Sequence, residues 1–250
     1  MKSKITVALI AATILLPQAI IAQNATRGVV EAVIGSDLNS VLPDDVVYMY
    51  PEFQKGTILF SDRSSAEGTV NLYLIGSQVH FIAPGGDTLV MKDQDKARLL
   101  SVGKDTYIRH DRSWVRIISV QEELALGIRS TVNFEQAQKI GAYGMTDATS
   151  SISSVDRISD IQNQPTAIEA YGNAYGSTSS VYLKSLRNIP YTLTHDVLLY
   201  DGEKLYTPSR RNFTKFFPDK KDLIKKYVKD NKLDLNKAQD ALKLFNFLSL

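Results

Sequence analysis

Short apolar runs separated by turn residues dominate residues 56–129. The runs are rich in Val, Ile, Leu, Tyr and Phe, and Gly, Asp, Asn and Ser lie between them. Short runs with this punctuation are typical of antiparallel strands joined by tight turns. The pattern therefore predicts a β meander, with strands near residues 57–60, 69–75, 78–83, 88–91, 97–102, 106–109, 114–120 and 124–129.

Residues with a known role in turns support this meander. Pro84 presets a negative φ, and Gly85 and Gly86 accept a positive φ at little steric cost. A further strand is predicted at residues 46–50, where the run VVYMY is followed by Pro51. Bulky aromatic residues in the predicted strands are expected to fill one packed face of the sheet. These residues are Tyr73, Phe81, Tyr107 and Trp114.

Residues 141–188 differ in character from the strands before them. Residues 141–180 hold 12 Ser and Thr, and the tripeptide Ala-Tyr-Gly recurs at 142–144, 170–172 and 174–176. Apolar residues in this stretch are sparse and follow no period, which is typical of a linker or long loop. We therefore expect a boundary between a β-rich domain at residues 46–140 and a C-terminal region at residues 189–250.

The C-terminal region begins as a hairpin and ends as helices. Two apolar runs flank Asp201-Gly202, a pair typical of a tight hairpin turn. Ser209 is expected to cap a short helix, Asp219 to cap the next one, and Asn236 with Gln239 to form a capping box for the last. The last two helices carry apolar residues at helical spacing and are expected to pack as an antiparallel pair. The predicted fold class is therefore α+β, an antiparallel β meander followed by a β-hairpin and a C-terminal helical pair.

The first 22 residues have the three-part pattern of a secretory signal peptide. Lys2 and Lys4 form a positive start, a mostly apolar run follows, and Ala22 is a small residue at the predicted cleavage site. The apolar run is shorter than the ~20 residues of a membrane-spanning helix, and Pro17 interrupts it. We predict an exported protein, periplasmic or secreted after cleavage near Ala22, with no transmembrane anchor in the mature chain. Residues 23–45 are then a weakly patterned N-terminal lead-in.

The composition and the distribution of charge narrow the chemistry. The chain contains no Cys, so it has no disulfide, no thiolate metal site and no Cys nucleophile. Its formal net charge is +2, yet residues 201–250 hold 12 basic residues against 7 acidic ones. We interpret the Lys-rich face of this region as a solvated helix face, because Asp residues interrupt it and its aromatic neighbour Tyr227 belongs to the opposite, apolar face. Nucleic acid is therefore not an expected partner. The lysines concerned are Lys220, Lys221, Lys225, Lys226 and Lys229.

No group of residues has a spacing that indicates catalysis or metal binding. The three histidines, His80, His110 and His195, form neither a close pair nor an H-E-x-x-H motif. The chain also has no G-x-S-x-G nucleophile elbow, P-loop or dinucleotide fingerprint. Five aspartates near strand ends do not have the spacing of a calcium loop and are interpreted as turn residues. The sequence thus predicts no enzyme, no cofactor and no metal. The aspartates are Asp87, Asp93, Asp95, Asp105 and Asp111.

Three stretches together carry a resemblance to known sequences. They are GGDTLVM at residues 85–91, GAYGMTDATSS at residues 141–151, and the tail that begins with NFTKFF at residue 212. In this pattern the chain resembles a family of uncharacterised exported proteins of Gram-negative anaerobic bacteria and their relatives. The resemblance implies a periplasmic or surface location and a layout of strands followed by helices. It implies no function and no catalytic residue.

Two functional hypotheses follow from the sequence. The first is a non-enzymatic structural or interaction protein of the cell envelope, with an envelope protein or a glycan as its partner. The alternative is a periplasmic or surface ligand-binding module for a sugar or a small apolar molecule. In the second case the candidate ligand contacts are the aromatic residues of the sheet, Tyr73, Tyr107 and Trp114.

Overall fold

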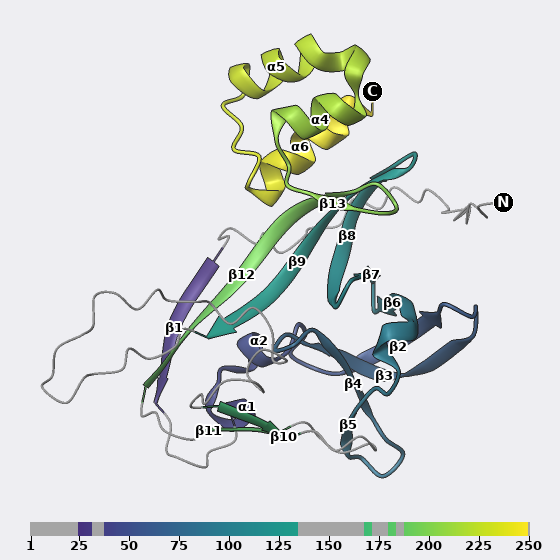
Figure 1. Ribbon diagram of the computed structural model, residues 1–250, viewed down its shortest axis with the longest axis vertical. Coiled ribbons are helices and arrows are strands. Elements are labelled where there is room, and N and C mark those ends of the chain that lie inside the picture. Colours follow the sequence, from purple (N-terminus) through teal and green to yellow (C-terminus); the bar gives the residue numbers. More distant parts are fainter. Residues whose placement is uncertain (1–24, 32–37, 135–167, 172–179, 184–187, 250) are drawn as a thin grey trace, which may run out of the picture.

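The computed structural model describes residues 25–31, 38–134, 168–171, 180–183 and 188–249. The described chain is mostly antiparallel β-sheet, followed by a helical segment at the C-terminus (Figure 1). One 11-stranded sheet has the order β1-β12-β9-β8-β7-β6-β2-β3-β4-β5, and β13 pairs with β12 beside this path. Its strands are β1 Ala25–Glu31, β2 Gln54–Phe60, β3 Ser65–Tyr73, β4 Gln78–Ile82, β5 Thr88–Val90, β6 Ala97–Val102, β7 Asp105–His110, β8 Ser113–Gln121, β9 Leu124–Phe134, β12 Asn188–Tyr200 and β13 Leu205–Tyr206.

The predicted strands between residues 57 and 129 are confirmed, but they form two meanders rather than one. Strands β2 to β5 pair in sequence order, and so do β6 to β9. The two meanders join because β2 also pairs with β6, where Gly56 lies opposite Val102. The short 3-10 helix η1 (Gln94–Lys96) connects β5 to β6. A strictly sequential order would have placed β5 beside β6.

The C-terminal hairpin belongs to the same sheet as the meanders. Strand β12 pairs with β9 along ten residues, from Tyr191 opposite Phe134 to Tyr200 opposite Ala125. On its other side β12 pairs with β1, so part of the N-terminal lead-in forms an edge of the sheet. The regions 46–140 and 189–250 therefore share one sheet, although they are far apart in the sequence. The predicted hairpin turn is confirmed at Gly202, which has a φ of 89°.

The prediction of a strand at residues 46–50 is wrong. The chain instead forms two short helices, α1 (Leu38–Val41) and α2 (Asp44–Val47), and only Tyr48 forms an isolated bridge, opposite Tyr73. The amides of Val46 and Val47 donate to the carbonyl of Pro43, which starts α2. Both valines are buried in the core. This burial outweighs the weak preference of β-branched residues for strands.

Three helices follow the sheet, as the sequence predicts, together with a short 3-10 helix. They are α4 (Arg210–Phe216), η2 (Pro218–Lys220), α5 (Lys221–Asp230) and α6 (Ala238–Leu248). The Ser209 cap is confirmed, because its hydroxyl accepts a hydrogen bond from the amide of Asn212 at 3.1 Å. The capping box is wrong, because α6 has Lys237 at its N-cap with no side-chain cap. The amide side chain of Asn236 instead contacts Asp234.

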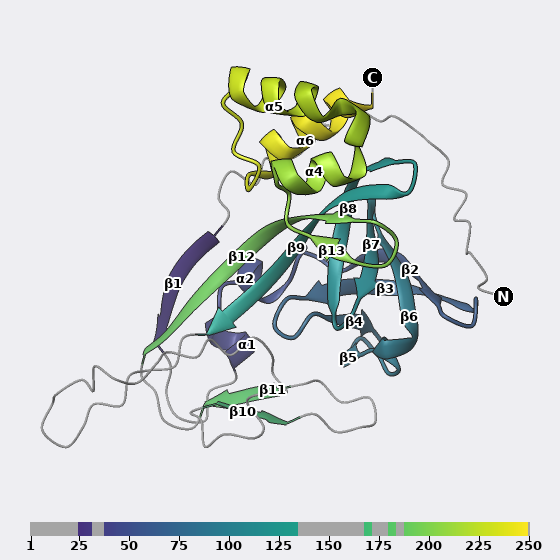
Figure 2. The same ribbon diagram turned by 45° about the horizontal axis from the view of Figure 1, so that its top comes forward.

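Two separate hydrophobic cores stabilise this arrangement. The first core lies among the meanders, α1, α2, the C-terminal end of β9 and the N-terminal part of β12. It contains Trp114, Val132 and Leu193. The second core contains the helices and the other ends of the same strands, with Leu126 and Leu199 from the sheet. Figure 2 shows the helices gathered at that end of the long strands. The helices are therefore packed on the sheet and share its interior.

Much of the predicted linker at residues 141–188 lies outside the described residues, as does the predicted signal peptide at residues 1–22. Within the linker, β10 (Ile168–Tyr171) and β11 (Ser180–Leu183) pair as a separate two-stranded sheet. In the described parts of the chain, none of the helices has the length and apolar character needed to span a membrane.

Candidate functional site

A cleft of about 690 Å³ opens where three turns of the sheet meet strand β9. The turns are those between β3 and β4, between β7 and β8, and between β12 and β13. Their side chains give the cleft a polar lining with both charges. The cations are Arg109, Arg112, Arg129 and Lys204, and the carboxylates are Asp95 and Asp111.

Arg109 differs from the other cations of the cleft in being half-buried without a counter-ion, because Arg112 and Lys204 are exposed and Arg129 is paired with Asp196. It lies near the end of β7, half-buried, and its Nη1 donates to the carbonyl of Ser77 at 2.8 Å. Its Nε is buried and has no hydrogen-bond partner among the described residues, and no described carboxylate forms an ion pair with it. Burial lowers the pKa of Arg109, while the negative charge of Asp95 acts in the opposite direction. A partly desolvated cation without a counter-ion is costly, since buried charges are normally paired.

The surroundings of Arg109 fix its position. Its guanidinium carbon lies 5.1 Å from the centre of the Trp114 ring, a cation–π contact between paired residues of β7 and β8. Ser77, in the turn between β3 and β4, accepts a hydrogen bond on its hydroxyl from the amide of Trp114 at 3.0 Å. The carbonyl of Ser77 holds Arg109 itself. The turn, the indole and the guanidinium are therefore one connected unit at the edge of the cleft.

Two other basic groups of the cleft have partners. Arg129 donates from Nη2 to Asp196 at 3.0 Å, across the pairing of β9 and β12. His110 has Nδ1 3.3 Å from the carboxylate of Asp111 and Nε2 3.1 Å from the carbonyl of Glu203. Through the second contact, His110 joins the turn between β7 and β8 to the turn between β12 and β13. Of the cations of the cleft that are not exposed, Arg109 is therefore the one without an ion pair among the described residues.

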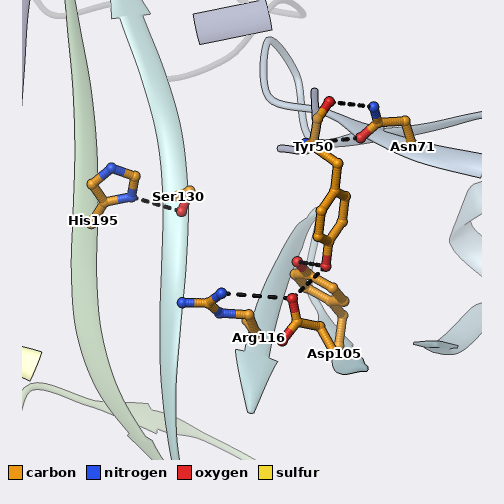
Figure 3. A network of polar contacts seen from close by, with 7 residues as sticks. Tyr50, Asn71, Asp105, Arg116, Ser130 and His195 are labelled. Carbon is orange, nitrogen blue, oxygen red and sulfur yellow. Dashed lines mark hydrogen bonds and ion pairs between the residues drawn. The ribbon is translucent and has the colours of Figure 1, made fainter. Parts of the chain in front are cut away.

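A second polar feature lies inside the sheet, between the two hydrophobic cores. Residues facing inward on β8, β9 and β12 alternate with residues facing outward. On each of the three strands, one inward-facing residue between the two cores is polar. We call these three residues the polar row (Figure 3). Its members are Arg116, Ser130 and His195.

The polar row continues into a network that reaches the loop before β2. Arg116 lies 3.6 Å from Asp105, and the hydroxyl of Tyr50 donates to the same carboxylate at 2.6 Å (Figure 3). The hydroxyls of Tyr50 and Tyr107 are also 2.6 Å apart. Burial raises the pKa of both tyrosines, so both remain neutral donors at physiological pH. The network joins the loop to β7 and β8.

The Ser130–His195 contact is part of the same row. The Ser130 hydroxyl lies 2.9 Å from Nδ1 of His195, its partner across the β9–β12 pairing. Burial lowers the pKa of His195, and the positive charge of Arg116 acts in the same direction. Ser130 is only 4% exposed. A nucleophilic serine must reach its substrate, and Ser130 is buried. We therefore interpret the Ser130–His195 contact as an internal hydrogen bond.

Asn71 fixes the other end of the network through hydrogen bonds to the backbone. Its Oδ1 accepts from the amides of Tyr50 and Leu72 at 3.2 and 2.8 Å, and its Nδ2 donates to the carbonyl of Tyr50 at 2.8 Å (Figure 3). Asn71 is 1% exposed, so Asn71→Ala leaves three backbone groups without these partners. We expect the free energy of unfolding to fall by about 2 kcal/mol in urea titrations. A fall below about 0.5 kcal/mol, typical of a surface substitution, would contradict this role.

The structure places the three predicted ligand contacts in the first core. Tyr73, Tyr107 and Trp114 are 0%, 1% and 2% exposed. Tyr73 donates its hydroxyl to Asn39 at 2.6 Å and stacks on His80 with ring centres 4.5 Å apart. Their rings are therefore not presented on an open face of the sheet, and only Trp114 adjoins the cleft, through Arg109 and Ser77.

The histidines and aspartates singled out in the sequence do not converge. His80 is buried beside Tyr48, His110 is at the cleft, and His195 is in the polar row. Among the described residues, no three His, Asp or Glu side chains lie close enough together to hold a metal ion. Only Asp95 and Asp111 of the five aspartates line the cleft, and Asp105 belongs to the network.

The residues that distinguish these sites were not identified as functional from the sequence. The polar row has a signal there, because each member interrupts an alternation of apolar inward residues, as His195 does between Leu193 and Val197. Arg109 has no such signal. Its missing counter-ion becomes apparent only when Ser77 and Trp114 are placed beside it.

Comparisons with families of known proteins, with curated proteins and with solved structures found no match to this chain, so the resemblance to exported bacterial proteins stays a prediction from its sequence.

Proposed function

We propose that this chain is an exported, non-enzymatic binding protein of the cell envelope, and that the cleft beside Arg109 takes a polar ligand. The observation that carries the proposal is the half-buried guanidinium of Arg109, without a counter-ion, at the edge of a cleft of about 690 Å³. That volume is in the range of small-molecule sites. A fixed donor that lacks a partner in the described chain is available to a ligand.

The chemistry of the histidines supports binding over catalysis. Both ring nitrogens of His110 face oxygen atoms of Asp111 and Glu203, so neither is directed toward a substrate as a base. His195 uses Nδ1 for the buried Ser130 hydroxyl. A cleft that positions donors and acceptors without an activated nucleophile is suited to holding a ligand unchanged.

The lining of the cleft supports a sugar over a small apolar molecule. Carboxylate, hydroxyl and guanidinium groups lie around it, with few apolar side chains at its surface. Sugar hydroxyls both donate and accept hydrogen bonds, so a mixed lining of this kind can satisfy them. An apolar ligand would instead leave these groups without water or partners. Lining residues with such groups include Asp95, Asp111, Ser113 and Thr131.

The proposal predicts that ligand binding is reported by Trp114, the chain's one tryptophan. We expect a sugar from a panel of neutral and acidic glycans to change its fluorescence, because the indole contacts Arg109. Ser113→Tyr, which places a large side chain at the cleft, should weaken binding at least tenfold, equivalent to about 1.4 kcal/mol. Ser101→Tyr, at an exposed position of β6 outside the cleft, is the matched control. Equal weakening by both variants, or no response to any glycan, would count against the proposal.

A protein partner is the second candidate, and helix α5 supports it. Four of its lysines are exposed, and so is Leu223, at 51%. An exposed apolar side chain among cations can contact an acidic partner surface, although a solvated helix face has the same composition. Capture of an envelope protein by the wild-type chain, lost when Lys225 and Lys226 are both replaced by Glu, would support this second function.

A further inference from the structure

The proposed cleft carries information about the charge of its ligand. Resting on the function proposed above, we infer that the ligand is an acidic sugar whose single carboxylate pairs with Arg109.

The cation requires an anion. The charge of Arg109 is partly removed from water, it has no ion-pair partner among the described residues, and its Nε is buried without a hydrogen bond. The carbonyl of Ser77 and the ring of Trp114 hold the guanidinium in place but do not neutralise it. Within the described chain, Nη2 has no hydrogen-bond partner. A carboxylate is the planar group that the guanidinium fork pairs with best, and the position of the fork is already fixed.

The carboxylates of the cleft limit the ligand to a low negative charge. Asp95 and Asp111 line the same cleft as Arg109. A phosphate ester placed there would bring up to two charges and three acceptor oxygens toward these acidic groups. Like charges at short range are unfavourable, and the cost grows with the charge of the ligand. A monoanion gains the attraction of Arg109 with the smaller repulsion.

The same two carboxylates can accept hydrogen bonds from the ligand if the rest of it carries hydroxyl groups. Ionised carboxylates only accept hydrogen bonds, and sugar hydroxyls donate them. Arg129 is already paired with Asp196, and Arg112 and Lys204 are exposed to water, so Arg109 is the cation that gains most from a ligand carboxylate. One half-buried cation without a counter-ion beside several acceptors therefore matches a hexuronate, in which one carboxylate accompanies several hydroxyls.

The test compares three ligands that share a shape: galacturonic acid, its methyl ester and galactose. Isothermal titration calorimetry of the purified chain should show galacturonic acid binding at least about tenfold more tightly than the ester or galactose, because only the acid supplies a charge to Arg109. Arg109→Gln should remove this preference. Arg210→Gln, the same charge change on an exposed residue of α4, should leave it unchanged.

Each outcome separates the inference from the function on which it rests. Equal affinity for the acid, the ester and galactose overturns the inference and leaves the binding cleft in place. Binding of inorganic phosphate as tight as that of galacturonic acid also overturns it. If no sugar of the wider panel binds, the proposed function fails. The three-ligand comparison uses the wild-type chain, so it decides the inference even if Arg109→Gln does not fold.

Discussion

Replacing Phe245 by alanine is expected to lower the free energy of unfolding by about 3–5 kcal/mol. Phe245 is 0% exposed and lies in the second core, together with Leu126 and Leu199 of the sheet. The substitution removes an aromatic ring from a site that the surrounding helices and strands cannot fully refill. The side chain of Gln121, at the end of β8, donates to the carbonyl of Phe245 and further ties helix α6 to the sheet.

The measurement is urea unfolding followed by two signals. Trp114 lies in the first core and reports the sheet, while far-UV circular dichroism also reports the helices. Because the second core contains residues of β9 and β12, we expect both signals to change in one transition, at a lower urea concentration than in the wild type. Leu223→Ala on α5, at a residue 51% exposed, is the control and should change stability by no more than about 0.5 kcal/mol. Loss of the helical signal alone, with the Trp114 transition unchanged, would show that the helices do not share the sheet's core.

Acidification is expected to destabilise the protein through His80. This residue is 3% exposed, stacks on Tyr73 and has Nδ1 3.0 Å from the hydroxyl of Tyr48. Burial lowers the pKa of His80 from 6.5 to about 4. The unfolded chain therefore binds a proton at a higher pH than the folded one, and stability falls as pH falls between these two values. The contribution of His80 is a loss of about 2 kcal/mol at pH 5 and about 3 kcal/mol at pH 4, relative to pH 7.

Two variants isolate this contribution, since the lowered pKa of His195 acts in the same direction. His80→Gln removes the titrating group, so the difference in stability between pH 7 and pH 5 should shrink by about 2 kcal/mol. Ser101→Gln, an exposed and non-titrating position of β6, should leave that difference as it is in the wild type. An unchanged pH dependence in His80→Gln would mean that His80 is not the buried neutral imidazole described above.

Local signals in the sequence determined the strands and turns. The predicted runs between residues 57 and 129 lie in β2 to β9, because alternating apolar residues and turn formers act over a few neighbouring positions. The same holds for Gly202 in the hairpin turn and for the cap at Ser209. The sequence was misleading where the local preference of a segment differed from the structure that its burial favours. Residues 46 and 47 favour a strand by composition, yet burial beneath the sheet makes them the end of a helix.

The candidate site could be predicted from the sequence less well than the fold. Trp114 was identified as a ligand contact, but the structure places its ring in the core and gives the exposed edge of the cleft to Arg109. The polar residue at position 116 interrupts an apolar pattern, which is a visible signal, but its ion-pair partner Asp105 on β7 has no such signal. A missing counter-ion is a property of the whole neighbourhood, so no pattern along the chain can indicate it.

By itself, then, the sequence determined which segments are strands or helices and where most of them turn. It also determined that the chain has no cysteine chemistry. Only the tertiary structure decided that β2 pairs with β6, that β1 and β12 join the sheet of the meanders, and that five distant segments enclose one cleft around Arg109. The physical reason is the range of the interactions. Propensity, capping and turn formation act between neighbours, whereas strand order, burial and charge pairing depend on residues brought together from across the chain.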